Sequence, residues 1–268
     1  MKILILINND LASNYALNLL IPKLLSEHSL TLWQSSNVGK LSRKPPALEQ
    51  LAFFEQRLFS DYLAPLIEKL PQQAGQRFKT FSQLATECHC VLKTVNNIND
   101  TESLAALKAL NPDLILSIRY GCILKEQAIA IPNHGILNLH SGVLPQYRGV
   151  MATFWSMKNN ETHIGTTLHR ISDSSIDTGE IVKISTRPIK VGQSYLWHVL
   201  TLYQQGIMDM LEAVNALSNS SNLPSLRQLG ESNYYTFPTG VELQEFEQSG
   251  MQLVNEQELH AFLKHHYL

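Results

Sequence analysis

The chain has 268 residues, of which 44% are hydrophobic and 16% charged, so it can bury a substantial core and is not a disordered tail. Its 21 Lys and Arg balance 23 Asp and Glu, and no long basic run occurs, so a broad nucleic-acid-binding surface is not expected. No run of about 18 apolar residues is present, so a membrane span is not expected either.

Three cysteines are too few for a disulfide framework and fit a reducing compartment, so we expect a cytoplasmic protein. Cys88-His89-Cys90 offers metal ligands, but no second cluster completes a set of four. His163 and His169 would share a face if both lay in one strand, but His163 is expected in the preceding turn. No metal site is therefore predicted.

The N-terminal segment predicts the start of a doubly wound sheet. Residues 3–7 form a continuous apolar run, which is typical of a strand buried on both faces. Residues 8–10 supply a turn, and a helix should follow over 11–26, with Pro22 kinking or splitting it. A second strand is expected over 30–33. Neither G-x-G-x-x-G nor a P-loop motif occurs, so a dinucleotide or P-loop nucleotide site is not indicated.

Residues 35–80 are harder to assign. A loop with a basic cluster (Lys40, Arg43 and Lys44) should precede two helices, over 47–59 and 61–70, the second ended by Pro71. The pattern then indicates a helix over 81–88 and a strand over 90–95.

The rest of the chain alternates more regularly between helix and strand. Strands are expected over 114–118, 136–140, 165–171 and 180–185, and helices over 101–110, 126–131, 152–158 and 195–217. From residue 218 the chain is turn-rich, with short helices at 242–248 and 256–266. We therefore predict an α/β protein: a Rossmann-like, mostly parallel sheet with helices on both faces, plus a small C-terminal extension over 218–268.

The most informative stretch is 134–149, H-G-I-L-N-L-H-S-G-V-L-P-Q-Y-R-G. Side chains alternate along a strand, so Asn138 and His140 share one face. By themselves they also fit an ordinary strand end whose polar groups bond to the backbone. Asp177 lies in a loop after a later strand and is placed to reach the same end of the sheet.

Together these three groups fit acyl transfer by positioning. Asn138 can donate to a developing oxyanion, His140 can move a proton, and Asp177 can orient the imidazole. Ser141 would face away on an extended chain, and no G-x-S-x-G elbow is present. The attacking group would then come from a substrate.

Segment 138–149, the preceding Y-G-C-I-L of 120–124 and the I-D-T-G of 176–179 resemble the folate-dependent formyltransferase family. This family includes methionyl-tRNA, glycinamide ribonucleotide and sugar-nucleotide N-formyltransferases. The similarity is densest over 111–189. It implies that Asn138, His140 and Asp177 are catalytic, that 10-formyltetrahydrofolate donates the formyl group, and that residues 1–217 form the catalytic domain.

The resemblance also implies where the ligands bind. The pterin of the donor would lie between segment 120–124 and loop 171–177, although the apolar residues there fit ordinary core equally well. The expected cofactor-binding residues are Tyr120, Gly121, Cys122, Ile123, Leu124, Asp173 and Ile176. The expected acceptor-binding residues are Asn8, Asn9, Ser141, Gly142, Tyr147 and Arg148. Arg148 fits an anchor for its own loop equally well, and segment 234–239 either lines the acceptor site or forms a packed aromatic turn.

Two departures from the family bear on the acceptor. The glycine-rich phosphate loop of the glycinamide ribonucleotide enzymes is replaced by N-N-D-L-A at 8–12, and the stretch after Pro188 is too short for the C-terminal barrel of the tRNA enzymes. A small-molecule amine is therefore expected, with an amino-sugar nucleotide as best guess and a hydroxylated ornithine as another possibility. Formyltetrahydrofolate hydrolysis and non-catalytic folate binding are the alternatives. The sequence leaves open whether the chain forms a homodimer.

Overall fold

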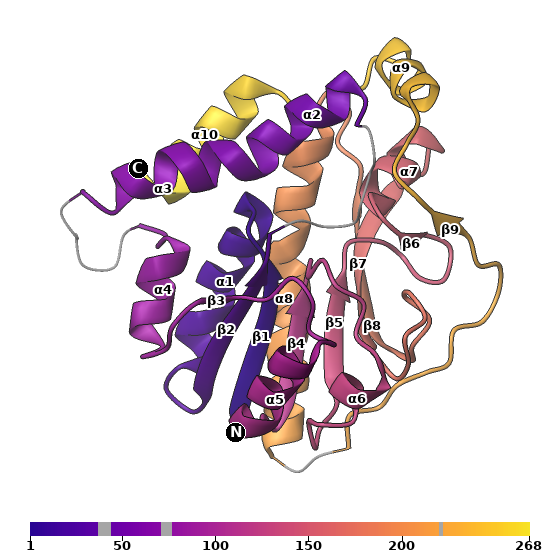
Figure 1. The fold of residues 1–268 in the computed structure, drawn as a ribbon. Coiled ribbons are helices and arrows are strands. Elements are labelled where there is room, and N and C mark those ends of the chain that lie inside the picture. Colours follow the sequence, from indigo (N-terminus) through magenta and orange to yellow (C-terminus); the bar gives the residue numbers. More distant parts are fainter. Residues whose placement is uncertain (37–43, 71–76, 220–221) are drawn as a thin grey trace.

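The computed structural model describes residues 1–36, 44–70, 77–219 and 222–268. Lys40, Arg43 and Pro71, which the sequence places in a loop and at a helix end, lie outside these ranges. A seven-stranded sheet forms the centre (Figure 1). Its strands are β1 (Lys2–Asn8), β2 (Ser29–Ser35), β3 (Lys93–Thr94), β4 (Leu114–Ile118), β5 (Ile136–His140), β7 (His163–Arg170) and β8 (Ile181–Pro188).

The strand order is β3-β2-β1-β4-β5-β7-β8. The first five of these strands run parallel, whereas β7 pairs antiparallel with both β5 and β8. The mostly parallel sheet expected from the sequence is thus confirmed. Along the chain, β2 and β3 are added on one side of β1, and β4 and β5 on the other side. In sheets of this kind, ligands bind in the crevice beyond the carboxyl ends of the two strands where the order changes direction, here β1 and β4.

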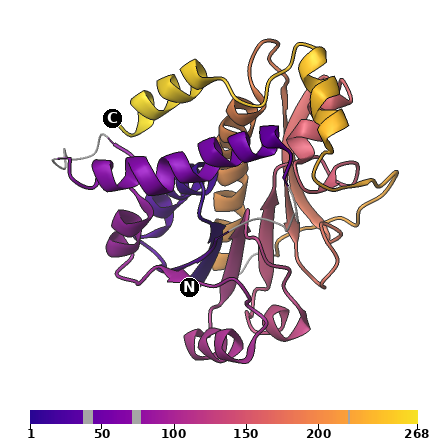
Figure 2. The same ribbon diagram turned by 45° about the horizontal axis from the view of Figure 1, so that its top comes forward.

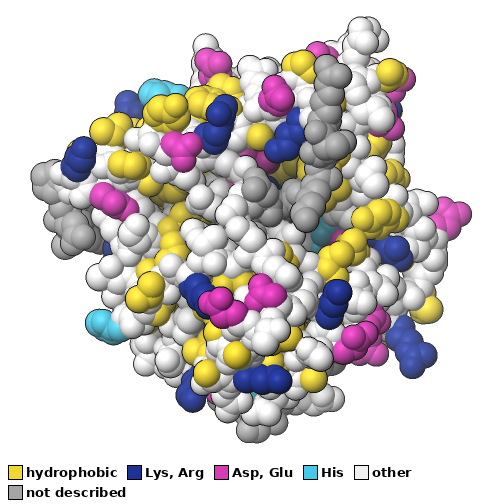
Figure 3. Space-filling model, viewed as in Figure 1, with side chains coloured by type: hydrophobic (Ala, Val, Ile, Leu, Met, Phe, Trp, Pro, Cys, Tyr) yellow, Lys and Arg dark blue, Asp and Glu magenta, His cyan; other side chains and the backbone are white. Residues whose placement is uncertain are grey.

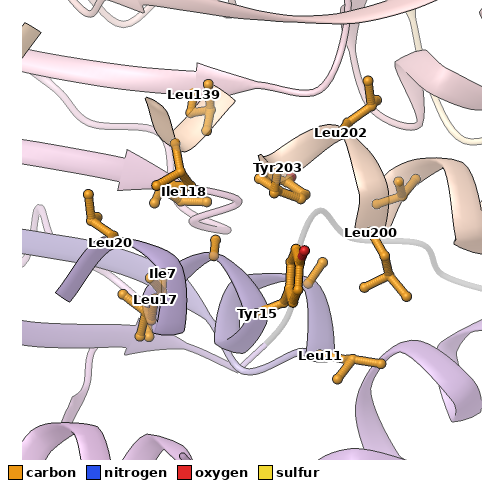
Figure 4. Packing of buried hydrophobic residues seen from close by; sticks show 14 of the residues in the cluster. Ile7, Leu11, Tyr15, Leu17, Leu20, Ile118, Leu139, Leu200, Leu202 and Tyr203 are labelled. Atoms are coloured by element: carbon orange, nitrogen blue, oxygen red, sulfur yellow. The ribbon is translucent and has the colours of Figure 1, made fainter. Parts of the chain in front are cut away.

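Helices cover both faces of the sheet. The helices of the described residues are α1 (Leu11–Leu24), α2 (Pro46–Ala52), η1 (Phe53–Leu63), α3 (Ala64–Ile67), α4 (Phe81–Glu87), α5 (Thr101–Leu110), α6 (Glu126–Ile129), α7 (Ala152–Lys158), α8 (Tyr195–Ser218), α9 (Gly240–Gln248) and α10 (Glu256–His266). Side chains of β1, β4 and β5 that face α1 and α8 build the larger core, as Ile7, Ile118, Leu139 and Tyr203 illustrate (Figure 4). The opposite face packs against α5 and α6 through a second cluster that includes Leu6 and Leu107.

The stretch from Pro46 to Ile67 differs from its prediction. It contains one continuous run of α2, η1 and α3 in place of two helices separated near residue 60. The middle of the run, η1, is a π-helical segment, whose turns each hold more residues than an α-helical turn. Figures 1 and 2 show this run crossing the sheet at the carboxyl ends of the parallel strands.

Several other helix and strand boundaries differ from those predicted from the sequence. Pro22 does not split α1, which runs through it to Leu24. The strand expected over 90–95 is reduced to the two residues of β3. His163, expected in a turn, is the first residue of β7 because it pairs with Pro188 of the edge strand β8.

The C-terminal segment, residues 218–268, packs into the larger hydrophobic core. The helix expected over 195–217 is α8, which ends at Ser218. Beyond it, Phe246, Leu263 and Tyr267 join the same core as α1, and the buried Tyr267 hydroxyl donates to Asn14 Oδ1 at 2.7 Å. A short strand, β9 (Tyr234–Tyr235), pairs with β6 (Arg148–Gly149).

The face of the molecule shown in Figure 3 carries mixed charge. Lys and Arg side chains are interspersed with Asp and Glu over this face. Across the described ranges, no helix combines the length and apolar character needed to cross a bilayer.

Candidate active site

Strand register brings three polar side chains together at the carboxyl end of β4 and β5. Ser117 of β4 is paired with Asn138 of β5, and Asn138 is paired with His169 of β7. Paired residues on neighbouring strands point to the same face of a sheet, so the three side chains form a row. All three line one cavity of about 870 Å³.

His169 fixes the orientation of the Asn138 amide. The His169 Nδ1 atom lies 2.9 Å from the carbonyl oxygen of Arg170, which can only accept, so Nδ1 carries the proton. His169 Nε2 is then free to accept from Asn138 Nδ2 at 3.0 Å. Because an amide nitrogen has two hydrogens, one N–H of Asn138 is left over for a ligand.

The His140 imidazole is nearly enclosed, with 8% of the residue exposed. Its Nε2 donates to the backbone carbonyl of Tyr147 at 2.7 Å. Its Nδ1 lies 3.5 Å from Asp177 Oδ2 and is therefore the atom at which the ring can gain or lose a proton. The ring lies close to Gly142, where a Cβ would be 2.7 Å from His140 Nε2.

The Asp177 carboxylate lies close to both imidazoles, those of His140 and His169. Burial raises the pKa of its carboxyl, but His140, His169 and the Gly149 N–H together outweigh burial and lower that pKa to about 2. Its Oδ1 lies 3.4 Å from His169 Nε2, and its Oδ2 accepts from the Gly149 N–H at 2.8 Å. The carboxylate is therefore ionised at neutral pH.

Two contacts hold the Asp177 loop in place. A Cβ on Gly179 would lie 1.7 Å from the carbonyl oxygen of Arg170, so only glycine allows this close approach to β7. The Gln228 side-chain amide, from the C-terminal segment, donates to the backbone oxygens of Asp177 at 2.9 Å and Gly179 at 2.8 Å.

The seven expected cofactor-binding residues all line the cavity: Tyr120, Gly121, Cys122, Ile123, Leu124, Asp173 and Ile176. Ile123 is 52% exposed, so it is not ordinary core, whereas Leu124 is buried in the core beside α5 and α6. The segment is held by its own polar contacts. The Tyr120 hydroxyl donates to Val95 O at 2.7 Å, and Asn99 Nδ2 donates to Ile123 O at 2.8 Å.

The expected acceptor-binding residues divide into two groups. Asn8 and Ser141 line the main cavity, and Asn9 lines a second cavity of about 510 Å³. Gly142, Tyr147 and Arg148 are not among the described residues that border either cavity. The Tyr147 hydroxyl bonds to Glu161 at 2.7 Å, and Arg148 Nη1 donates to Ser232 Oγ at 3.1 Å, the contact of a loop anchor.

Sequence reasoning assigned no role to several residues that border the site. His169 was considered only as a metal ligand, although within the described ranges no group of three or more His, Cys, Asp or Glu is arranged to hold a metal. Its proximity to Asn138 depends on the β5–β7 register, which no local pattern reports. Glu55, Arg119, Tyr195 and Tyr203 also line the main cavity.

Comparison with known proteins agrees with this geometry. Residues 68–195 match the family described as formyl transferase, and this range includes Asn138, His140, His169 and Asp177. This part of the chain is therefore similar to the formyl transferase family. Methionyl-tRNA formyltransferase of Thermodesulfovibrio yellowstonii is 36% identical over 114 residues, which are 42% of this chain and 37% of that protein. The enzyme of Trichlorobacter lovleyi is 26% identical over 207 residues, 76% of this chain and 64% of that protein, so the chain spans less than two thirds of either relative.

Solved structures share the fold at low identity. The N-formyltransferase from Helicobacter canadensis, in complex with folinic acid and dTDP-3-aminofucose, aligns with a TM-score of 0.58 and 18% identity, covering 88% of this chain and 71% of that one. Glycinamide ribonucleotide transformylase 1 from Symbiobacterium toebii aligns with a TM-score of 0.59 and 13% identity, covering 86% and 94%.

Proposed function

We propose that the protein transfers a formyl group from 10-formyltetrahydrofolate to the amine of a small molecule. The observation that carries this proposal is the free N–H of Asn138 beside His140 and Asp177, in the cavity that also contains the 120–124 and 171–177 segments. Residues 1–217 would supply this catalytic unit.

The residues around the cavity fit a folate donor. A pterin is flat and apolar on its faces and has hydrogen-bonding edges. Ile123, Leu124 and Ile176 offer apolar walls, and the polar backbone of the two segments borders the same space. Such a combination of apolar walls with a few convergent polar groups is typical of small-molecule sites. The donor would supply a formyl group carried on nitrogen.

The roles of the protein groups follow from their contacts. The free N–H of Asn138 donates to the formyl oxygen and stabilises the negative charge that grows there during attack. As the acceptor nitrogen bonds to the formyl carbon, the bond from that carbon to the folate nitrogen breaks. The proton lost by the amine passes to the departing folate nitrogen; His140 moves this proton, and Asp177 stabilises the protonated ring. In this proposal the attacking nitrogen belongs to the acceptor.

For the acceptor, we propose an amino-sugar nucleotide. The Helicobacter canadensis structure, with its folinic acid and dTDP-3-aminofucose, supports this class. The turn after β1 argues against a phosphate group bound there, because the Asp10 carboxylate already caps α1 by accepting the Ser13 N–H at 2.7 Å.

A labelled donor tests the proposal. The protein is incubated with 10-[¹³C]formyltetrahydrofolate and a panel of nucleotide-linked amino sugars, N5-hydroxyornithine and glycinamide ribonucleotide, and products are followed by mass spectrometry. We expect the label in an N-formyl amino sugar and little formate when the amine is omitted. Formate at equal rates with and without amine would instead establish a hydrolase. Binding of a folate analogue without turnover of any amine would establish a binding protein.

A further inference from the structure

One group of polar side chains in the main cavity plays no part in the formyl-transfer site. Glu55 comes from η1, Arg119 follows β4, and Tyr195 and Tyr203 come from α8. All four line the cavity that contains Asn138 and His140. Arg119 adopts a left-handed backbone conformation (φ 58°), which a side chain other than glycine rarely adopts and which tends to occur at functional sites.

Arg119 makes a close ion pair with Asp10 but only a distant contact with Glu55. Arg119 Nε donates to Asp10 Oδ2 at 2.8 Å, and Asp10 also accepts from Asn8 and Ser13. By contrast, Arg119 Nη2 lies 3.7 Å from Glu55 Oε1, which is too far for a hydrogen bond. Burial raises the pKa of Glu55 to about 7, because the nearby Arg119 only partly offsets the loss of solvent and Asp10 opposes ionisation.

Two buried oxygen atoms here, Glu55 Oε1 and the Tyr203 hydroxyl, complete no hydrogen bond within the described ranges; Arg119 and Ser141 lie near the Tyr203 hydroxyl. Tyr203 is fully buried, with 0% of the residue exposed. More than nine in ten buried polar groups in proteins are satisfied, so two exceptions that border one cavity indicate a ligand.

Glu55 also lies on an unusual helix. η1 is a π-helix of 11 residues, whereas π-helical turns in proteins are usually single and are frequently found at functional sites. Because each of its turns holds more residues, a π-helix sets its side chains in different directions from an α-helix. Glu55, in its first turn, is the acidic side chain that it contributes to the cavity.

The charges indicate which chemical group fits. Arg119 already pairs with Asp10, so its guanidinium offers little unpaired positive charge to a phosphate bound beside Glu55. Lys44 is a further cation on the cavity wall. An uncharged group that donates hydrogen bonds would satisfy Glu55 Oε1 and also bond to the Tyr203 hydroxyl, which can both donate and accept.

We propose that Glu55 and Tyr203 form a subsite for hydroxyl groups of the acceptor, so that a polyhydroxylated amine binds with its ring hydroxyls here and any phosphates elsewhere. This inference rests on the proposed function, because it concerns the acceptor of the same cavity. It identifies Glu55 and Tyr203 as specificity-determining residues outside the formyl-transfer site.

Tyr203→Phe is the cleanest test, because it removes one oxygen that completes no hydrogen bond among the described residues. With a nucleotide-linked amino hexose as acceptor, we expect its KM to rise roughly tenfold, since an unmade buried hydrogen bond costs on the order of 1–3 kcal/mol. The dissociation constant of a folate analogue should stay unchanged. Tyr267→Phe is the matched control, a buried tyrosine whose hydroxyl bonds to Asn14, and it should leave the acceptor KM unchanged.

Variants of Glu55 distinguish a hydroxyl from an ammonium ligand. Glu55→Ala should raise the acceptor KM roughly tenfold or more, whereas Glu55→Gln keeps an acceptor oxygen and should recover most of that loss. If Glu55→Gln is as impaired as Glu55→Ala, an ammonium binds there and the hydroxyl subsite is wrong. If wild type transfers formyl groups but Tyr203→Phe and Glu55→Ala keep the acceptor KM, the subsite is also wrong. If wild type transfers none to any amine, the proposed function itself fails.

Discussion

At the scale of single residues, the activity proposed for Asn138 depends on a histidine in the neighbouring strand. His169 accepts one amide hydrogen of Asn138 and lies 3.4 Å from Asp177. It touches no reacting atom in the proposed mechanism, so it is a positioning residue. The amide is free to turn its oxygen toward the ligand if this contact is lost.

We therefore expect His169→Ala to lower kcat roughly 10- to 100-fold, the equivalent of one unmade buried hydrogen bond of ~1–3 kcal/mol. Folate-analogue affinity should be unchanged, and His169→Gln should recover part of kcat because its amide oxygen can accept from Asn138. His163→Ala, at the exposed start of the same strand, is the control. Wild-type kcat in His169→Ala would disprove the positioning role.

Glu55 gives a pH-dependent prediction for stability. Its pKa rises from 4.5 to about 7 on folding, so the folded state favours the protonated form. The stability that this group contributes is complete below about pH 4.5 and is lost as pH rises toward 7. Glu55→Gln should therefore stabilise the protein by roughly 2–3 kcal/mol more at pH 8 than at pH 5, at ~1.4 kcal/mol per pKa unit. Denaturant unfolding at both pH values measures this difference, and equal effects would refute it.

At the scale of elements, the loop after β5 determines where His140 sits. A Cβ on Gly142 would lie 2.5 Å from Ala152 Cβ and 2.8 Å from the carbonyl oxygen of Tyr147. That carbonyl is the acceptor for His140 Nε2. The glycine thus allows α7, the loop and the imidazole to meet closely, which explains its place in the motif without any contact to a ligand.

Gly142→Ala should therefore destabilise the fold by ~1–3 kcal/mol through overpacking and should also reduce kcat by displacing His140. Gly240→Ala is the matched control, because nothing lies within 4 Å of a Cβ there and the residue begins α9. Thermal unfolding and steady-state rates report both effects. An active Gly142→Ala protein with wild-type stability would show that the loop accommodates a Cβ at this position, and the predicted overpacking would be wrong.

The elements also show where sequence reasoning succeeds. Buried strands such as β4 and β5 were predicted with their observed ends, because a continuous apolar run bounded by turn residues specifies both. Asn138 and His140 were placed on one face by simple alternation. η1 was missed because single-sequence patterns assume an α-helical period, and the His169–Asn138 contact was missed because register between strands 31 residues apart is not local.

At the scale of the whole molecule, the C-terminal segment helps to shape the site. Gln228 bridges the backbone of Asp177 and Gly179, and β9 pairs with β6, whose Gly149 N–H bonds to Asp177. The two Gln228 contacts span 51 and 49 residues of sequence, so no local motif could have predicted them. The segment that the sequence marks as an extension therefore supports the loop that carries a proposed catalytic residue.

Gln228→Ala should loosen the Asp177 loop and lower kcat roughly tenfold, because two carbonyl oxygens lose a shared donor worth ~1 kcal/mol or more. Folding should be retained, since Gln228 is half-buried and belongs to a turn-rich stretch. The neighbouring Leu229→Ala, at an 83% exposed position, serves as the control. Equal rates for Gln228→Ala and Leu229→Ala would show that the Gln228 hydrogen bonds to the Asp177 loop do not affect catalysis.

The most direct test of the central claim is the rate of formyl transfer by Asn138→Ala in a single turnover, with saturating 10-formyltetrahydrofolate and the accepted amine. We predict a rate lower by on the order of 100- to 1,000-fold, the usual cost of removing one oxyanion donor, with unchanged affinity for a folate analogue. Transfer at the wild-type rate would contradict the assignment of Asn138, and with it the active site described above.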